Sequence, residues 1–415
     1  PMSIFNKKKA IDFSIYGFGQ LVSLLIPFIV LPFLIRICGE EGLGKIGTGF
    51  SIALILCSIV DYGSYVIGVR EISINRENPT LLNDKVNAIY GSKLLLLFLL
   101  AVILGFLITF VPFFYQEKEL MIFSFMIVIG QSISPLWFLQ GVENFKWISF
   151  INITSKLIYL LGVYTIVSTK LDYVYVNLIY GMGLFISSII GLIWILNRYS
   201  FALTPKGLWS GITIIKEEFS FSVSQLLMSI HQYVPILIVR YLLGDFVAGQ
   251  FKVIDQILSL FKTFFNIMFY FVYSNICIEI EKNYKHGIKV WKQYNLVSFI
   301  VVVLGVVSCV LFSEFIISFF NVNKNSVFQL AEILRLGLII GLLMTFSQPL
   351  KQLIFALGKN KVYEIMTIFV TVLNVLLMVY LTQEYQLFGT IGAMIAIECI
   401  ILISFVMILK TNKQS

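Results

Sequence analysis

Long apolar segments recur along almost the whole chain, and this pattern most constrains what it can fold into. A helix needs about 20 residues to cross the hydrocarbon core of a bilayer. No polar stretch between the segments is long enough for a domain outside the membrane. The sequence therefore predicts an all-α integral membrane protein with about twelve transmembrane helices. These lie near residues 12–37, 45–69, 86–112, 118–140, 147–168, 173–196, 216–240, 247–276, 291–313, 328–356, 361–381 and 387–409.

The composition agrees with this fold class. Hydrophobic residues make up 59% of the 415 residues and charged residues only 13%, against about 25% charged residues in a soluble domain. Three lysines, Lys7 to Lys9, precede the first apolar run. That run is longer than the core of a signal peptide and has no small-residue cleavage site, so we expect it to be kept as the first span.

Motifs for the common membrane-associated chemistries are missing from the sequence. The five cysteines are scattered without a CxxC spacing and the two histidines are far apart, so neither a disulfide framework nor a metal or other cofactor is predicted. There is no phosphate-binding GxxxxGK[ST] loop, no HExxH and no GxSxG. A membrane-embedded glycan polymerase is expected to carry a sizeable outer loop or an acidic catalytic cluster there, and the outer loops are short. The sequence thus argues against an enzyme.

The distribution of Lys and Arg predicts the orientation of the spans, since cytoplasmic loops carry the excess of positive charge. With the N-terminus inside, the inner segments hold eighteen of the 30 basic residues, the outer segments hold seven, and five lie within spans. We therefore expect both termini to be cytoplasmic. The net charge of +8 follows mostly from this topology, so a nucleic-acid partner is not predicted.

A polar connector near the middle of the chain divides the spans into two sets of six. The expected domains are an N-terminal six-helix bundle at 1–197, a cytoplasmic connector at 198–217, and a C-terminal six-helix bundle at 218–415. An even number of spans gives both bundles the same orientation, related by an axis along the membrane normal. Transporters built in this way bind substrate between the two halves.

The two halves also resemble each other in sequence. Gly39 and Gly44 recur as Gly244 and Gly249, and Gln20 recurs as Gln225, all 205 residues later. Glycines and polar residues matched at one offset are less easily explained by chance than apolar matches between membrane helices. The pattern predicts an internal structural repeat.

Lys156 is a charged residue near the middle of a predicted span. A helix from Trp147 to Val167 is long enough to cross the bilayer, and Lys156 falls near its middle. A lysine at this depth costs about 2.5–3.5 kcal/mol on insertion scales, so such residues face a wet cavity, a partner or a substrate. Trp137, Trp147 and Trp194 are expected at the membrane interfaces, where aromatic belts form.

Other ionisable side chains within or beside the spans have both functional and packing interpretations. Asp61 is either a coupling group or a satisfied contact between helices, and Lys93 lies close enough to the inner face to reach it. Asp255 and Lys262 are two turns apart on one helical face, where they either form part of a polar stripe or compensate each other's charge through water. The remaining candidates are Arg36, Arg335, Lys351, His231 beside Pro235, and Glu398, which would otherwise be a protonated, packed acid.

Four segments carry a resemblance to a known family, and it covers the full length of the chain. They are Pro27 to Gly44, Val60 to Glu71, Leu171 to Tyr173, and Pro135 to Lys146 with its P-x-W-F-x-Q-G-x-E pattern. The sequence resembles the O-antigen and polysaccharide flippases of the Wzx type. These belong to the MOP superfamily, which also contains the multidrug and toxin extrusion (MATE) transporters.

The resemblance implies a MATE-like, V-shaped arrangement of two bundles in a bacterial inner membrane. Its implied function is to flip undecaprenyl-diphosphate-linked oligosaccharide from the inner to the outer leaflet by alternating access, driven by a proton or sodium gradient. Implied partners are the lipid-linked glycan, the bilayer, and polysaccharide polymerase and chain-length proteins. A cation-coupled drug exporter on the same architecture, and a polytopic glycan polymerase or ligase, remain as alternatives.

The chemistry of a diphosphate assigns roles to the charged candidates. Long basic side chains make charge-assisted hydrogen bonds to phosphate oxygens and lower the cost of moving the anion through apolar surroundings. We expect Lys156 and Lys262 to be the principal head-group contacts, with further substrate-binding candidates at Arg36, Lys93, Arg335 and Lys351. Candidates for taking up the coupling ion are Asp61, Asp255, His231 and Glu398.

Overall fold

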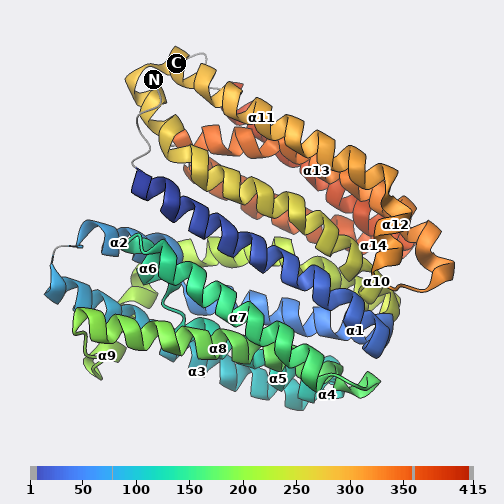
Figure 1. Cartoon of the computed structure of the whole chain (residues 1–415), viewed down its shortest axis with the longest axis horizontal. Helices are drawn as coiled ribbons and strands as arrows, with labels where there is room; N and C mark the ends of the chain where they lie inside the picture. The colour runs from blue at the N-terminus through green and yellow to red at the C-terminus, as the bar shows by residue number, and fades with distance from the viewer. Residues whose placement is uncertain (1–6, 77, 358–359, 411–415) are drawn as a thin grey trace. The chain divides into compact units, whose positions relative to one another are not determined.

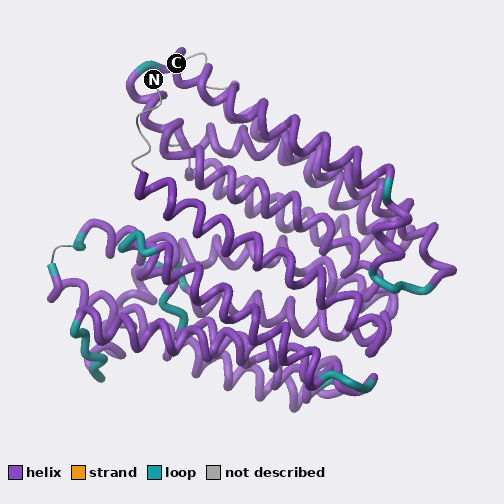
Figure 2. The backbone as a smooth tube through the Cα atoms, in the orientation of Figure 1, coloured by secondary structure: helices purple, strands orange, loops and turns teal. Residues whose placement is uncertain are grey.

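The computed structural model describes residues 7–76, 78–357 and 360–410, and these are almost entirely helical (Figure 1, Figure 2). Nine helices within them are long and apolar enough to cross a membrane. The prediction of an all-α protein with many membrane-spanning helices is confirmed at this level. Two of the eighteen basic residues in the predicted inner segments, Lys359 and Lys413, lie outside the described residues.

The three longest helices each contain one residue with a non-helical backbone. These are α1 (Lys7–Asp61) with Gly39 at φ 75° and ψ 174°, α10 (Phe219–Lys282) with Gly244 at φ 86° and ψ 174°, and α14 (Asn360–Lys410) with Gln386 at φ 53° and ψ −137°. A positive φ is sterically free only for glycine. The backbone angles at Gly39 and Gly244 are nearly the same. These two glycines are also paired by the sequence repeat.

The chain divides into two compact units. Unit 1 consists of Pro1–Cys38 and Lys45–Ser229, and unit 2 consists of Gly39–Gly44 and Ile230–Ser415. The short segment after the break in α1 thus packs with unit 2.

Unit 1 is built from a series of apolar helices joined by short turns. Besides its parts of α1 and α10, it contains η1 (Ser64–Gly68), α2 (Val69–Ile74), α3 (Pro79–Phe110), α4 (Pro112–Gln116), α5 (Lys118–Ile133), α6 (Leu136–Gly141), α7 (Phe145–Ile166), η2 (Lys170–Asp172), α8 (Tyr173–Tyr199) and α9 (Lys206–Glu217). Helix α8 packs against both α5 and α7, and α9 packs against α3. Asn78 and Asn144 begin α3 and α7 as N-caps, because their side chains accept hydrogen bonds from the backbone of the first turn.

The P-x-W-F-x-Q-G-x-E segment forms α6 and the turn after it, and it is part of the core of unit 1. Trp137 and Phe138 are buried and pack with Tyr90. The expectation that Trp137 belongs to an interfacial belt is wrong, because its side chain is 0% exposed. At Gly141 a Cβ atom would lie 2.7 Å from Ile72, so only glycine lets α6 approach α2 this closely. The segment is thus a packing motif.

The region between the two predicted bundles contains α9, which lies on α3. A Cβ atom on Gly91 would come within 2.0 Å of the Gly207 carbonyl oxygen, and one on Gly211 within 2.4 Å of the Ser92 amide nitrogen. The three glycines therefore allow the two helices to touch through their backbones. Trp209 and Leu208 are exposed on α9.

Unit 2 combines long helices with one short helix. It contains the greater part of α10, then α11 (Tyr284–Leu311), α12 (Ser313–Phe319), η3 (Lys324–Ser326), α13 (Val327–Ala356) and α14. Helix α13 packs against α11, α12 and α14, so it forms the centre of the unit. Pro349 lies within α13, close to its C-terminal end.

The second pair of repeated glycines makes a reciprocal contact in unit 2. A Cβ atom on Gly44 would lie 1.9 Å from the Asp245 carbonyl oxygen, and one on Gly249 would lie 1.8 Å from the Glu40 carbonyl oxygen. Asp245 is 205 residues after Glu40, so the two contacts are related by the same offset as the glycines themselves. The matched geometry supports the internal repeat predicted from the sequence.

Candidate functional site

The first candidate site is a buried ion pair in unit 1. Lys93 on α3 is 1% exposed, and its Nζ lies 3.0 Å from Asp61 Oδ1 at the end of α1. The Nε2 amide of Gln131 donates to Asp61 Oδ2 at 2.9 Å and to the Tyr65 hydroxyl at 3.2 Å. Helix α1 ends at Asp61 because the next two residues, Tyr62 and Gly63, adopt positive φ. Three spans therefore meet in one polar network.

This arrangement decides between the interpretations of Lys93. A side chain that reached the inner interface would be solvated, whereas this ammonium is enclosed and bonded to a carboxylate. The expectation that Lys93 extends to the interface is therefore wrong. The side chain of Asp61 is 19% exposed. The carboxylate is therefore the member of the pair that solvent can reach, and the Lys93 ammonium compensates the charge of the carboxylate.

Lys156 lies on α7 in an aromatic setting. Its Nζ is 2.5 Å from the Tyr180 hydroxyl and 4.0 Å from the centroid of the same ring. Tyr180 in turn packs edge-on against Tyr159 and Phe50. In the described part of the chain no carboxylate forms an ion pair with Lys156. The ammonium is thus supported by a π face and a hydroxyl, and its charge is not neutralised.

In unit 2 the candidates gather around Lys262 on α10. Its Nζ lies 3.5 Å from Asp255 Oδ1, and the Nζ of Lys252 lies 3.6 Å from Asp255 Oδ2. The carboxylate is therefore shared by two lysines on one helix face, as the spacing of Asp255 and Lys262 predicts. Lys252 was not among the predicted site residues, although its i, i+3 spacing to Asp255 could have revealed it.

Two further titratable groups of unit 2, Glu398 and His231, interact electrostatically with Lys262. Glu398 on α14 accepts a hydrogen bond from the Ser347 hydroxyl on α13 and interacts electrostatically with both Lys262 and Lys351. His231 also interacts electrostatically with Lys262. Four predicted residues from three helices are thus brought into one electrostatic cluster with Asp255.

Two amide and hydroxyl partners of this cluster were not predicted from the sequence. The side chain of Asn374 is 3% exposed, and its Nδ2 lies 3.1 Å from His231 Nδ1. Ser347 is fully buried beside Glu398. Both are polar residues within apolar segments, and this is the sequence feature that could have identified them as candidates. Their partners lie on other helices and could not be read from spacing.

Two of the predicted residues, Arg36 and Arg335, lie outside the groups described above. Arg36 is exposed on α1. The guanidinium of Arg335 donates to the Ser313 hydroxyl at 2.8 Å and to Glu314 at 3.0 Å, at the start of α12. Lys351 also lies over the Phe355 and Tyr363 rings, 6.0 and 5.6 Å from their centroids. Arg335 is therefore held by its own neighbours, apart from the Lys262 cluster.

The donor sets do not suggest a bound metal. Within residues 7–76, 78–357 and 360–410, no group of three or more His, Cys, Asp or Glu side chains is arranged to hold a metal ion. What the clusters offer is a set of lysine ammonium groups beside carboxylates within membrane-spanning helices. Ionisable residues inside membrane spans commonly mark substrate or ion pathways.

The carboxyl group of Glu218, outside the spans, is perturbed by its neighbours. Burial and the negative charges of Glu217 and Glu71 raise the pKa of Glu218, against the opposing effect of Lys85. Glu218 follows the last residue of α9, so this unfavourable charge lies at the end of the connector.

The family model described as "Polysaccharide biosynthesis protein" matches residues 11–273. A "Putative O-antigen transporter" of Escherichia coli (strain K12) is 22% identical over 392 residues, which cover 94% of this chain and 94% of that protein. The solved structure "Lipid II flippase MurJ, inward closed conformation" aligns with a TM-score of 0.71 and 13% identity, covering 95% of this chain and 87% of that chain. An inward-facing multidrug resistance MATE family transporter of the MOP superfamily aligns with a TM-score of 0.69 and 15% identity, covering 95% and 99%. At these identities the structures show a shared fold.

Proposed function

The chain belongs to the polysaccharide biosynthesis protein family, and we propose that it is a transporter that flips a lipid-linked oligosaccharide across the bacterial inner membrane. Its full-length similarity to a putative O-antigen transporter supports this substrate class. The proposed cargo is an undecaprenyl-diphosphate-linked glycan, moved from the inner to the outer leaflet by alternating access. Uptake of a proton or sodium ion at Asp61 or in the Lys262 cluster would drive the return step.

We infer that each limb of the three broken helices crosses the membrane separately. On either side of Gly39, Gly244 and Gln386 the limbs are long enough to span, since each covers at least about 20 residues. Together with the six other spans this gives twelve crossings and puts both termini on the same side. The excess of Lys and Arg in the predicted inner loops supports the cytoplasmic side.

The observation that carries the substrate assignment is the uncompensated ammonium of Lys156. It lies in the middle of α7 beside Tyr180, without a carboxylate partner in the described part of the chain. A cation kept in a span without a counter-charge is costly, and an anionic substrate would supply that counter-charge. Lys262 is the second contact, because its carboxylate partner is already shared with Lys252.

Complementation of a deletion strain tests this proposal. Lys156→Ala and Lys262→Ala should abolish surface glycan at unchanged protein level, and Lys156→Arg should restore part of it because the charge is kept. Lys170→Ala is the matched control, since Lys170 is exposed in the turn before α8. Full surface glycan in both alanine variants would contradict the assigned contacts.

The leaflet in which the lipid-linked precursor accumulates separates the alternatives. A flippase defect leaves complete units on the inner leaflet, whereas a defect in a polymerase or ligase leaves unpolymerised units outside. The fold shared with a multidrug transporter keeps a cation-coupled drug exporter as a second candidate. It predicts increased drug susceptibility of the deletion strain with normal surface glycan.

A further inference from the structure

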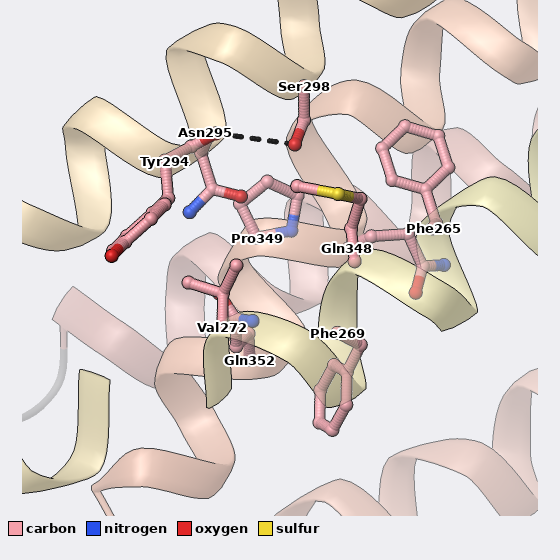
Figure 3. Close-up of a pocket in the computed structure, with 10 residues that line it drawn as sticks. Phe265, Phe269, Val272, Tyr294, Asn295, Ser298, Gln348, Pro349 and Gln352 are labelled. Carbon is pink, nitrogen blue, oxygen red and sulfur yellow. Dashed lines mark hydrogen bonds between the residues drawn. The ribbon is translucent and has the colours of Figure 1, made fainter. Parts of the chain in front are cut away.

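Helix α11 in unit 2 has one side that packs against other helices. The buried residues on this side are Gly287, Ser298, Val302 and Val306. Trp291 lies on the same side, and its indole Nε1 donates to the Pro349 carbonyl of α13 at 3.2 Å. Figure 3 shows Asn295 and Ser298 together with Pro349 around a small pocket among α10, α11 and α13. Neighbouring helices of the unit therefore occupy this side of α11.

The opposite side of α11 is exposed, and its chemistry changes along the helix. Two residues make about half a turn of helix, so Leu296 lies opposite Ser298. Intervals of three, four and seven residues place six exposed side chains on this face. In order from the N-terminal end they are Lys285, Lys289, Lys292, Leu296, Ile300 and Val307, and we call this row the α11 stripe. At a rise of about 1.5 Å per residue, its lysines cover about 10 Å and its apolar residues about 16 Å.

The lysines of the α11 stripe have no counter-charge. Among the residues that the structure describes, no carboxylate forms an ion pair with any of the three. The nearby Glu279 instead contacts Lys282 at 3.3 Å and His286 at 3.5 Å. Like charges three and four residues apart on one helix face destabilise the helix. An anion bound across the three ammonium groups would relieve this repulsion.

The order of charged and apolar groups along the stripe matches that of a phospholipid molecule. With the phosphate at the lysines, the acyl chains would lie along Leu296, Ile300 and Val307. These residues cover about 16 Å, close to one leaflet of a hydrocarbon core about 30 Å thick. A zwitterionic headgroup carries its own cation beside the phosphate, whereas an anionic headgroup supplies the net negative charge that the lysines lack. A free phosphate would leave the apolar part of the stripe uncovered.

We propose that the α11 stripe binds an anionic phospholipid of the surrounding bilayer, with the phosphate held by Lys285, Lys289 and Lys292. The site requires only that α11 crosses the membrane, for which the helix is long and apolar enough, and it does not depend on which molecule is transported. Each basic residue near an anionic membrane surface raises the affinity about fivefold. The three lysines together therefore contribute about a hundredfold.

Titration of the full chain in an uncharged detergent tests the proposal, with native mass spectrometry counting the bound lipids. Dioctanoyl phosphatidylglycerol is the anionic probe, and dioctanoyl phosphatidylcholine has the same chains with a zwitterionic headgroup. Farnesyl diphosphate and inorganic phosphate are the polyprenyl and free-anion probes. We expect phosphatidylglycerol to bind saturably and more tightly than phosphatidylcholine. Raising the salt concentration from 0.05 to 0.5 M should weaken phosphatidylglycerol binding, because exposed charges are screened.

Three matched variants locate the site. The triple variant Lys285→Gln/Lys289→Gln/Lys292→Gln should bind phosphatidylglycerol about a hundredfold more weakly. Arginine at the same three positions keeps the charge and should keep the affinity within about twofold. The control Lys146→Gln/Lys206→Gln/Lys216→Gln removes three exposed lysines of α7 and α9 and should bind as the unmodified chain does. All of the substituted side chains are exposed, so the variants should melt at the same temperature as the unmodified chain.

Four results would overturn the proposal. The glutamine variant of the stripe could bind phosphatidylglycerol as the control does, or phosphatidylcholine could bind as tightly as phosphatidylglycerol. Inorganic phosphate could bind as tightly as the lipid, which would make the lysines a site for a soluble anion. Lastly, the stripe variant could lose farnesyl diphosphate while keeping phosphatidylglycerol, which would assign the lysines to a polyprenyl diphosphate.

Discussion

Removing either member of the Lys93–Asp61 pair is the sharpest test of the polar network in unit 1. The variants Lys93→Met and Asp61→Asn each delete one charge while keeping the approximate size of the side chain. At 3.0 Å and an effective dielectric constant of about 20, the attraction between the two charges is about 5–6 kcal/mol before desolvation is subtracted. Breaking one side of a buried ion pair costs about 3–5 kcal/mol in practice.

The structure predicts that the two single variants differ. After Lys93→Met, the Asp61 carboxylate keeps its hydrogen bond from Gln131 and its 19% exposure, so we expect a loss near the lower end, about 3 kcal/mol. After Asp61→Asn, the Lys93 ammonium is 1% exposed and has lost its carboxylate, so we expect about 5 kcal/mol. The double variant leaves no buried charge and should be no less stable than Lys93→Met.

Unfolding of the four purified proteins in detergent, by heat and by SDS titration, measures these differences as a double-mutant cycle. Lys170→Met is the control, since its side chain is exposed. Additive losses in the double variant, or an Asp61→Asn protein as stable as the unmodified chain, would refute the ion-pair argument. The double variant should fold yet fail to restore surface glycan, because the carboxylate proposed for ion coupling is gone.

Two further predictions concern the repeat and the connector. Gly44→Ala and Gly249→Ala should each lower the melting temperature and reduce the free energy of unfolding by about 1–3 kcal/mol or more, because the added Cβ atoms would lie 1.9 and 1.8 Å from backbone carbonyl oxygens. Gly392→Ala has nothing within 4 Å of its Cβ and should raise the free energy of unfolding by about 0.5–1 kcal/mol. Equal melting of all three would contradict the close contact. The raised pKa of Glu218 means that its ionised form destabilises the fold, so its stabilising contribution is present at low pH and is lost as the pH rises through the raised pKa. Glu218→Gln should therefore melt at a higher temperature than the unmodified chain at pH 8 and at the same temperature at pH 4. A higher melting temperature at pH 4 but not at pH 8 would contradict the raised pKa.

The fold class followed from the order of the amino acids alone. Apolar segments of this length must form helices in a bilayer, because every backbone polar group has to be satisfied within the segment. The sequence also located the glycine pairs, since backbone contacts as close as those of Gly44 and Gly249 tolerate no side chain. The Asp255–Lys262 contact was readable too, because both residues lie on one face of one helix.

The pairing of polar and charged groups between helices, by contrast, was decided only by the tertiary structure. Lys93 pairs with a carboxylate 32 residues away, and Glu398 bonds a serine 51 residues away, on neighbouring helices. Helical periodicity fixes the face on which a side chain lies, but the partner on that face depends on how the helices pack. For the same reason Trp137, whose sequence position suggested the membrane interface, lies in the core of unit 1.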